Sequence, residues 1–172
     1  MIPQIKRILY TTDLSDNSTV VLKYAMNSAR TYDAGIIILY VLEPLSVTGT
    51  AITDSYLTGE QAKKISEEKL VYVKDRVNKQ LKIFCEKELK NDPECAERVE
   101  AIELCEGFPP DVILMKADEF NCDMIVMGTH GKGIIRSTFL GSTSKRVLRR
   151  TRKPVFIIPL PKEEADIGLG DM

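Results

Sequence analysis

The feature of the sequence that most constrains the fold is a regular alternation of short apolar runs with longer stretches of helical periodicity. The clearest run follows Gly35 and spans residues 36–42, which are all apolar or aromatic and rich in isoleucine. An uninterrupted run of this kind is typical of a strand that is covered on both faces. Strands joined by helical crossovers must be parallel, and such crossovers are right-handed. The alternation therefore predicts an open parallel sheet between two layers of helices.

The same alternation predicts five strands and four helices. The strands are expected at residues 5–10, 36–42, 99 to about 107, 123–127 and 155–158. The helices are expected at residues 16–32, 60–89, 109–120 and 141–150. Together they make a single three-layer α/β domain over residues 1–160. Residues 44–59 are expected to form a loop insertion, and residues 161–172 a flexible tail.

Apolar residues at helical spacing predict which helix faces are buried. In the first helix the predicted inner face consists of Val21, Tyr24 or Ala25, Ser28 and Tyr32. In the long second helix it consists of Leu70, Val73, Val77, Leu81 and Phe84. In the third helix it consists of Val112, Ile113, Lys116, Ala117 and Phe120.

Composition excludes several classes of protein. The chain has 24 basic and 25 acidic residues among 172, which is too balanced for a strongly basic nucleic-acid binder or a charge-repelled disordered chain. Its apolar runs fall short of the ~18 residues that a membrane helix needs. The start of the chain lacks the apolar core of an export signal, so a cytoplasmic location is expected.

The four cysteines, Cys85, Cys95, Cys105 and Cys122, form no Cys-x-x-Cys pair, and the single histidine is distant from them in sequence. This spacing favours free thiols in a reducing compartment over disulfides or a zinc site.

Two loops stand at the carboxyl ends of predicted strands, where open parallel sheets bind ligands. The first is residues 11–15, which include Asp13. The second is residues 128–133, a glycine-rich loop that leads to Gly141 and three hydroxyl residues at a helix start. Glycines let backbone N–H groups approach an anion, and a helix N-terminus favours phosphate. The pattern is typical of a phosphate cradle, although a glycine-rich turn before a capped helix would look the same.

Two familiar nucleotide signatures are absent. A P-loop needs Lys and then Ser or Thr after its last glycine, but Ile134 and Ile135 follow Gly133. A Rossmann fingerprint needs a third glycine and belongs after the first strand, whereas here Arg136 takes the third position and the loop follows the fourth strand. The chain is therefore neither a Walker-type NTPase nor a classical dinucleotide dehydrogenase.

The spacing Gly128-x2-Gly131-x9-Gly141-Ser142 resembles the nucleotide-binding pattern of the ATP-binding universal stress proteins. The segments at residues 6–15, 123–127 and 153–155 also look like that family, in the same order along the chain. The resemblance implies a flavodoxin-like sheet, of the kind seen in adenine nucleotide alpha hydrolases, with strand order 3-2-1-4-5. It also implies a nucleotide-dependent stress-response module with at most slow hydrolysis, which binds ATP, or alternatively ADP or AMP, with Mg held through the phosphates.

The resemblance assigns roles to individual positions. Asp13 would meet the adenosine, Val41 would contact the adenine, and the pair Met127 and Gly128 would border the ribose and phosphates. The complete set of implied nucleotide-binding residues is Thr11, Thr12, Asp13, Val41, Met127, Gly128, His130, Gly131, Lys132, Gly141, Ser142 and Thr143. Thr11 departs from the family pattern, because some ATP-binding members have proline there. The family also implies a homodimer through the strand at residues 155–158.

Alternative interpretations remain at this stage. The same fold serves ATP-cleaving and nucleotide-transferring enzymes, although their H-x-G-H and S-G-G-x-D-S signatures are absent. A member that has lost nucleotide binding, or a flavin protein, would share the architecture. His130 as a general base and Asp13 as a metal ligand are less favoured than nucleotide contacts. The basic residues between 145 and 153 are interpreted as the solvated end of a helix, which its dipole favours, instead of a nucleic-acid surface.

Overall fold

The computed structural model describes residues 2–15, 17–43, 59–88, 93–129 and 140–159. Five strands lie within these ranges: β1 (Arg7–Thr12), β2 (Gly35–Leu42), β3 (Val99–Glu106), β4 (Met124–Gly128) and β5 (Val155–Ile158). The described helices are α1 (Ser18–Tyr32), α3 (Gly59–Glu88), α4 (Pro93–Glu97), α5 (Pro109–Glu119) and α6 (Ser142–Arg150). Of the predicted insertion at residues 44–59, residues 44–58 lie outside the described residues, and Gly59 is the first residue of α3 instead of the end of a loop. The predicted tail at residues 161–172 also lies outside the described residues.

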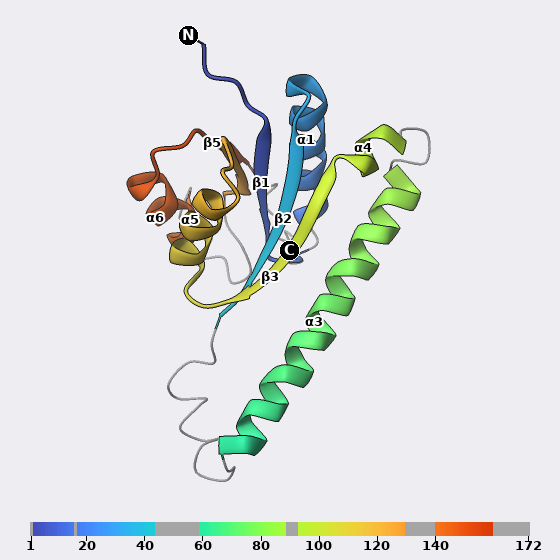
Figure 1. Ribbon diagram of the computed structural model, residues 1–172, viewed down its shortest axis with the longest axis vertical. Coiled ribbons are helices and arrows are strands. Elements are labelled where there is room, and N and C mark those ends of the chain that lie inside the picture. The colour runs from blue at the N-terminus through green and yellow to red at the C-terminus, as the bar shows by residue number, and fades with distance from the viewer. Residues whose placement is uncertain (1, 16, 44–58, 89–92, 130–139, 160–172) are drawn as a thin grey trace, which may run out of the picture.

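The strands form one parallel sheet in the order β3-β2-β1-β4-β5 (Figure 1). This order confirms the three-layer α/β fold expected from the alternation and the strand order that the resemblance implied. β1 lies at the centre, with Leu9 opposite Ile37 of β2 on one side and Ile125 of β4 on the other. Every strand therefore ends at the same edge of the sheet.

Alternate residues of the central strands fill two cores. Ile8, Tyr10 and Ile38 face α1 together with Val126. Leu9, Ile37 and Ile125 face the opposite way, toward α5 and α6. Because successive strand residues point to opposite faces, uninterrupted apolar runs are what a sheet covered on both sides requires. The central part of the sheet is therefore buried on both faces.

The boundary of the first strand differs from the expectation. β1 runs from Arg7 to Thr12 instead of residues 5–10, so Thr11 and Thr12 pair with Leu39 and Tyr40 of β2. Two β-branched residues next to an established partner strand extend the ladder beyond the apolar run. This extension carries the loop after β1 to the level at which β2 ends.

The inner face predicted for the first helix is partly wrong. Val21, Ala25 and Ser28 are buried as predicted, but Tyr32 is 50% exposed, and Tyr24, the alternative to Ala25, is 48% exposed. Leu22, Met26 and Ala29 are buried as well. The buried stripe instead centres on pairs of adjacent residues such as Val21 and Leu22, and another buried pair follows one helical turn later. Tyr24 lies at the border of that stripe, where its ring meets the ring of Phe156 edge to face, with 6.1 Å between the centroids.

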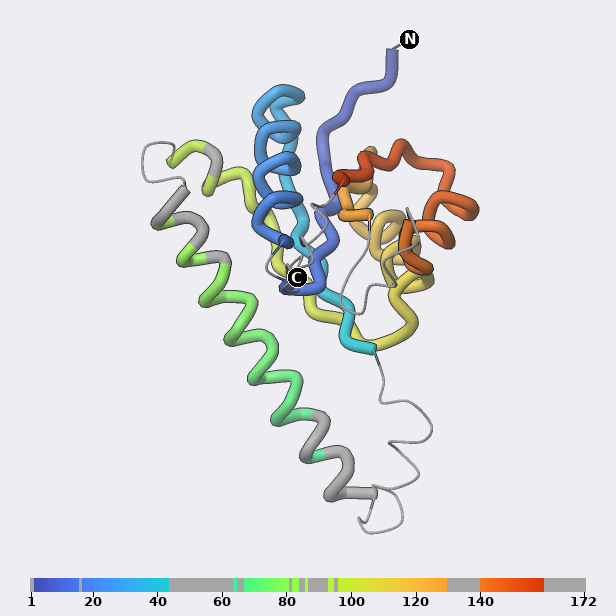
Figure 2. The backbone as a smooth tube through the Cα atoms, turned by 180° about the vertical axis from the view of Figure 1, so that it is seen from behind, coloured from blue at the N-terminus to red at the C-terminus, as the bar shows by residue number. Residues whose placement is uncertain are grey.

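The long helix α3 lies beside β3 and extends past the carboxyl ends of the strands (Figures 1 and 2). Of its predicted inner face, Val77 is buried and Leu70 and Val73 are half-buried, while the side chains of Leu81 and Phe84 lie outside the described set. The short helix α4 was not predicted. Its five residues are too few to show helical periodicity in a sequence.

The third helix largely matches its prediction. Val112, Ile113 and Ala117 are buried, while Lys116 and Phe120 are half-buried. Lys116 keeps its ammonium group in ion pairs with Glu119 at 2.9 Å and Glu103 at 3.5 Å. Burial of the aliphatic stem with a paired head is how a lysine occupies an inner face.

Cys105 and Cys122 are free thiols in the structure. Burial raises the pKa of the Cys122 thiol to about 11, so the thiol stays protonated at neutral pH. Among the described residues there is no cluster of histidine, cysteine and carboxylate side chains that could hold a metal ion. None of the described helices has the length and apolar character needed to cross a membrane.

Candidate functional site

The strand order reverses direction between β1 and β4, and this is where the candidate site lies. The chain proceeds from β1 through β2 to β3 on one side and continues with β4 and β5 on the other side. The loops that follow β1 and β4 therefore leave the same edge of the sheet and diverge. A crevice at such a switch point is the usual ligand site of an open parallel sheet.

The loop after β1 is held by hydrogen bonds from its own backbone. The Leu14 N–H donates to Thr12 Oγ1 at 3.1 Å, and the Ser15 N–H donates to Asp13 Oδ1 at 3.0 Å. Leu14 is buried with a φ of 57°, a left-handed conformation that is unfavourable for a leucine. These bonds fix Asp13 immediately beyond the end of the strand.

The negative charge of Asp13 acts on two tyrosine hydroxyls. Burial is the main factor that raises the pKa of Tyr10 and of Tyr40, and the negative charge of Asp13 raises both further. The positive charge of Arg76, on α3, acts in the opposite direction on Tyr40. Tyr10 in turn donates to the Ser18 carbonyl at 2.8 Å, which links β1 to the start of α1.

Tyr40 was not among the residues predicted for the site. It pairs with Thr12 across the β1–β2 ladder, so it stands next to the Asp13 loop. The sequence signal that could have found it is the register between the two apolar runs. That register depends on pairing between strands, which one strand's pattern does not contain.

The end of β4 is tied to the start of α6. The Ser144 hydroxyl, which is 2% exposed, donates to the Gly128 carbonyl at 3.0 Å. The Thr129 N–H donates to the Ile158 carbonyl at 3.0 Å, and the Gly141 N–H donates to the Thr129 carbonyl at 2.7 Å. The helix therefore begins beside the carboxyl end of β4, although ten intervening residues lie outside the described set.

The N-terminus of α6 has the features of an anion-binding end. Gly141 is its N-cap, no side chain caps it, and no acidic residue occupies its first turn. The first N–H groups of a helix have no intrahelical acceptor, and the helix dipole makes this end positive. Ser142 is exposed and Thr143 half-exposed, so both add hydroxyl groups at this position.

Nine of the twelve predicted site residues fall within the described ranges, and all nine lie at the ends of β1, β2 and β4 or at the start of α6. They are Thr11, Thr12, Asp13, Val41, Met127, Gly128, Gly141, Ser142 and Thr143. Val41 packs on the α5 face of the sheet. His130, Gly131 and Lys132 lie outside the described residues.

The family model of the universal stress protein family matches residues 4–159. This chain belongs to the universal stress protein family. Universal stress protein MJ0531 of Methanocaldococcus jannaschii is 31% identical over 160 residues, which cover 92% of this chain and 85% of that protein. Universal stress protein MJ0577 of the same organism is 27% identical over 89% of this chain and 94% of its own length.

Solved universal stress proteins share the fold. UspA from Lactobacillus plantarum superposes with a TM-score of 0.68 at 21% identity, covering 91% of this chain and 99% of its own. A universal stress protein solved in complex with cAMP superposes with a TM-score of 0.51 at 23% identity, covering 91% and 98%. These likenesses confirm that the sheet and its helices are those of a universal stress protein.

Proposed function

We propose that this universal stress protein binds ATP, with Mg held through the phosphates, at the switch point between β1 and β4. The observation that carries the proposal is the placement of the Asp13 loop and the acid-free N-terminus of α6 at one edge of the sheet. A carboxylate suits the hydroxyls of an adenosine, and a helix N-terminus suits a phosphate. ADP and AMP fit the same chemistry with fewer phosphates.

Each predicted residue has a role in this proposal. Val41, on the α5 face, gives apolar contact to the adenine, and Asp13 accepts a hydrogen bond from an adenosine hydroxyl. Met127 and Gly128 border the ribose, and Thr11 and Thr12 shape the loop that holds Asp13. The phosphate contacts are assigned to Gly128, His130, Gly131, Lys132, Gly141, Ser142 and Thr143.

We assign the protein a regulatory role in the stress response, with at most slow ATP hydrolysis. Asp13 already accepts from the Ser15 backbone, which suits a fixed acceptor better than a mobile proton carrier. The universal stress protein that was solved in complex with cAMP, an adenine nucleotide, supports this proposal. We place the protein in the cytoplasm, where free thiols such as Cys105 and Cys122 persist.

The role of Asp13 can be tested by two substitutions of graded severity. Asp13→Asn keeps an oxygen that can accept from the Ser15 N–H but removes the charge, so ATP affinity is expected to fall by about fivefold to tenfold. Asp13→Ala removes both and is expected to weaken binding by at least about tenfold. Isothermal titration calorimetry on nucleotide-free protein measures both dissociation constants. ATP affinity within about twofold of wild type in both variants would contradict the assignment.

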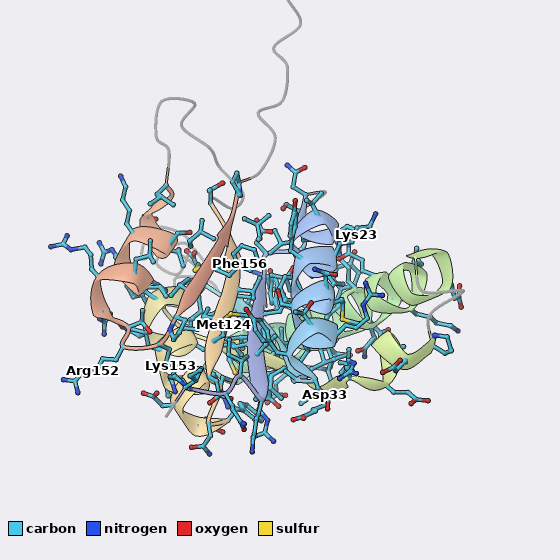
Figure 3. The ribbon with its side chains drawn as sticks, turned by 90° about the horizontal axis from the view of Figure 1, so that it is seen from above. Lys23, Asp33, Met124, Arg152, Lys153 and Phe156 are labelled. Atoms are coloured by element: carbon cyan, nitrogen blue, oxygen red, sulfur yellow. The ribbon has the colours of Figure 1, made fainter. Side chains whose placement is uncertain are left out.

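We further propose that two copies pair through β5. This strand is an edge of the sheet, and Val155 and Ile157 on one face and Phe156 on the other are partly or largely exposed. Figure 3 shows Phe156 on the side of β5 that faces α1. An apolar edge strand invites pairing, although Pro154 and Pro159 limit its length. The protein is expected to sediment as a dimer at micromolar concentration and Phe156→Arg as a monomer, whereas a monomeric wild type would contradict the pairing.

A further inference from the structure

The aromatic ring of the residue before α5 and a guanidinium group of α6 meet at the edge of the sheet that carries the candidate site. Phe108 directly precedes α5 and is 47% exposed. The Arg146 guanidinium of α6 lies over its ring, 5.2 Å from the centroid. A cation over an exposed ring is held loosely, so the ring positions the arginine without consuming its hydrogen-bond donors.

The position of Arg146 on α6 directs it toward the helix start. Arg146 follows Ser142 by four residues and Thr143 by three, so the three residues share one face of the helix. Long side chains on a helix lean toward its N-terminus. The guanidinium is therefore carried toward the turn that the proposed function assigns to phosphate.

Arg146 differs in its ion pairing from Arg150, which lies one helical turn later. Arg150 forms an ion pair with Asp111 of α5. Within the described ranges Arg146 makes no ion pair, and the contact that its guanidinium makes there is with the ring of Phe108. A guanidinium has a planar set of donors that matches phosphate oxygens, and no acidic side chain in the described ranges competes for the donors of Arg146.

Phe108 stands next to the opposite end of the proposed site. The Gly107 N–H donates to the Leu42 carbonyl at 3.0 Å, which ties the residue before Phe108 to the end of β2. Leu42 directly follows Val41, the proposed adenine contact. The Phe108–Arg146 pair therefore bridges the strand end proposed for the base and the helix start proposed for the phosphates.

We infer that Arg146, positioned by Phe108, binds the outer phosphates of the nucleotide and makes the protein prefer adenosine di- and triphosphates to the monophosphate. This inference rests on the proposed function, because it adds a specificity-determining residue to the same site. A monophosphate ends at the helix N-terminus, whereas a longer phosphate chain continues along the face that Arg146 occupies. Arg146 thus discriminates between nucleotides by the number of their phosphates and does not change how the adenosine is recognised.

The test is calorimetric titration of nucleotide-free wild type and three variants with AMP, ADP and ATP. Arg146→Gln is expected to weaken ATP binding by about tenfold or more and AMP binding by less than about twofold. Phe108→Leu keeps apolar bulk but removes the ring face, so a smaller loss of about threefold is expected for ATP alone. Arg152→Gln removes the same charge beyond the far end of α6, where Figure 3 shows the side chain pointing outward, and is expected to change neither affinity.

The outcomes separate this inference from the proposed function. Wild type that binds ATP, with Arg146→Gln keeping the wild-type ratio of ATP to AMP affinity, overturns the role of Arg146 and leaves the proposed function intact. An equal loss of ATP affinity in Arg152→Gln would show a general effect of positive charge and would also overturn the role of Arg146. An unchanged Phe108→Leu beside a weakened Arg146→Gln overturns the positioning role of the ring. Wild type that binds none of the three nucleotides overturns both proposals.

Discussion

Replacing Gly141 with valine is expected to weaken ATP binding by at least about tenfold while the fold survives. Gly141 has φ −66° and ψ 164°, a conformation open to any residue, so the glycine is not needed for the backbone itself. Because glycine has no side chain, a phosphate can approach the backbone closely at this position. A branched side chain at the N-cap of α6 would occupy that space.

The same substitution has a small predicted effect on stability. Valine is a poorer N-cap than glycine by about 1 kcal/mol, which corresponds to a fall of roughly 2–4 °C in the melting temperature of a domain of this size. Gly141→Ala serves as the graded control, with an intermediate loss of affinity. Calorimetry gives the dissociation constants, and circular dichroism gives the melting temperatures without nucleotide. If Gly141→Val bound ATP as tightly as wild type, phosphate would not lie at this helix start.

Gly107→Ala is expected to lower the free energy of unfolding by about 2–4 kcal/mol. Gly107 has a φ of 147°, a region that residues with a side chain rarely adopt. A Cβ atom there would lie 2.8 Å from Cγ2 of Val112, which is buried in the first turn of α5. The substitution therefore combines backbone strain with a contact that packed side chains cannot relieve.

Gly35→Ala is the matched control for this prediction. An added Cβ at Gly35 would meet the Glu100 side chain, which is the far end of a flexible residue that is partly exposed and ion-paired with Arg7. That side chain can move aside, and an exposed pair of this kind contributes at most about 1 kcal/mol. Urea unfolding should therefore show a loss under about 1 kcal/mol for Gly35→Ala. Equal losses in both variants would contradict the explanation from strain and packing.

Sequence patterns predicted the layers of the fold because a sheet that is buried on both faces requires strands made of uninterrupted apolar runs. The run at residues 36–42 matches β2, and the prolines at 109 and 110 mark the start of α5 as expected. The order of the strands came from the family resemblance, because periodicity carries no information on which strands are neighbours. Tyr32, and Tyr24 as an alternative to Ala25, were predicted on the inner face for a related reason, since helical spacing gives a stripe but not its exact centre.

The residues of the candidate site also fall into two groups, those that chain order predicts and those that depend on contacts between separate elements. Residues adjacent to strand ends, such as Asp13 and Gly141, could be predicted because chain order alone places them at one edge of a parallel sheet. Tyr40 was missed because its place beside Asp13 depends on the register of two strands. Phe108 and Arg146 were missed because their contact joins the residue before α5 to a residue of α6, 38 positions later in the sequence. Tertiary contacts of this kind leave no pattern in a single sequence.

We claim that adenine nucleotide binds at the switch point between β1 and β4, and a thermal shift on nucleotide-free protein is the experiment that tests this. Ligand at one hundred times its dissociation constant adds about 2.7 kcal/mol to the stability of the folded state. For a domain of this size the melting temperature should then rise by roughly 5–10 °C with Mg-ATP. Such a rise is the predicted result. An unchanged melting temperature at millimolar Mg-ATP would contradict the claim.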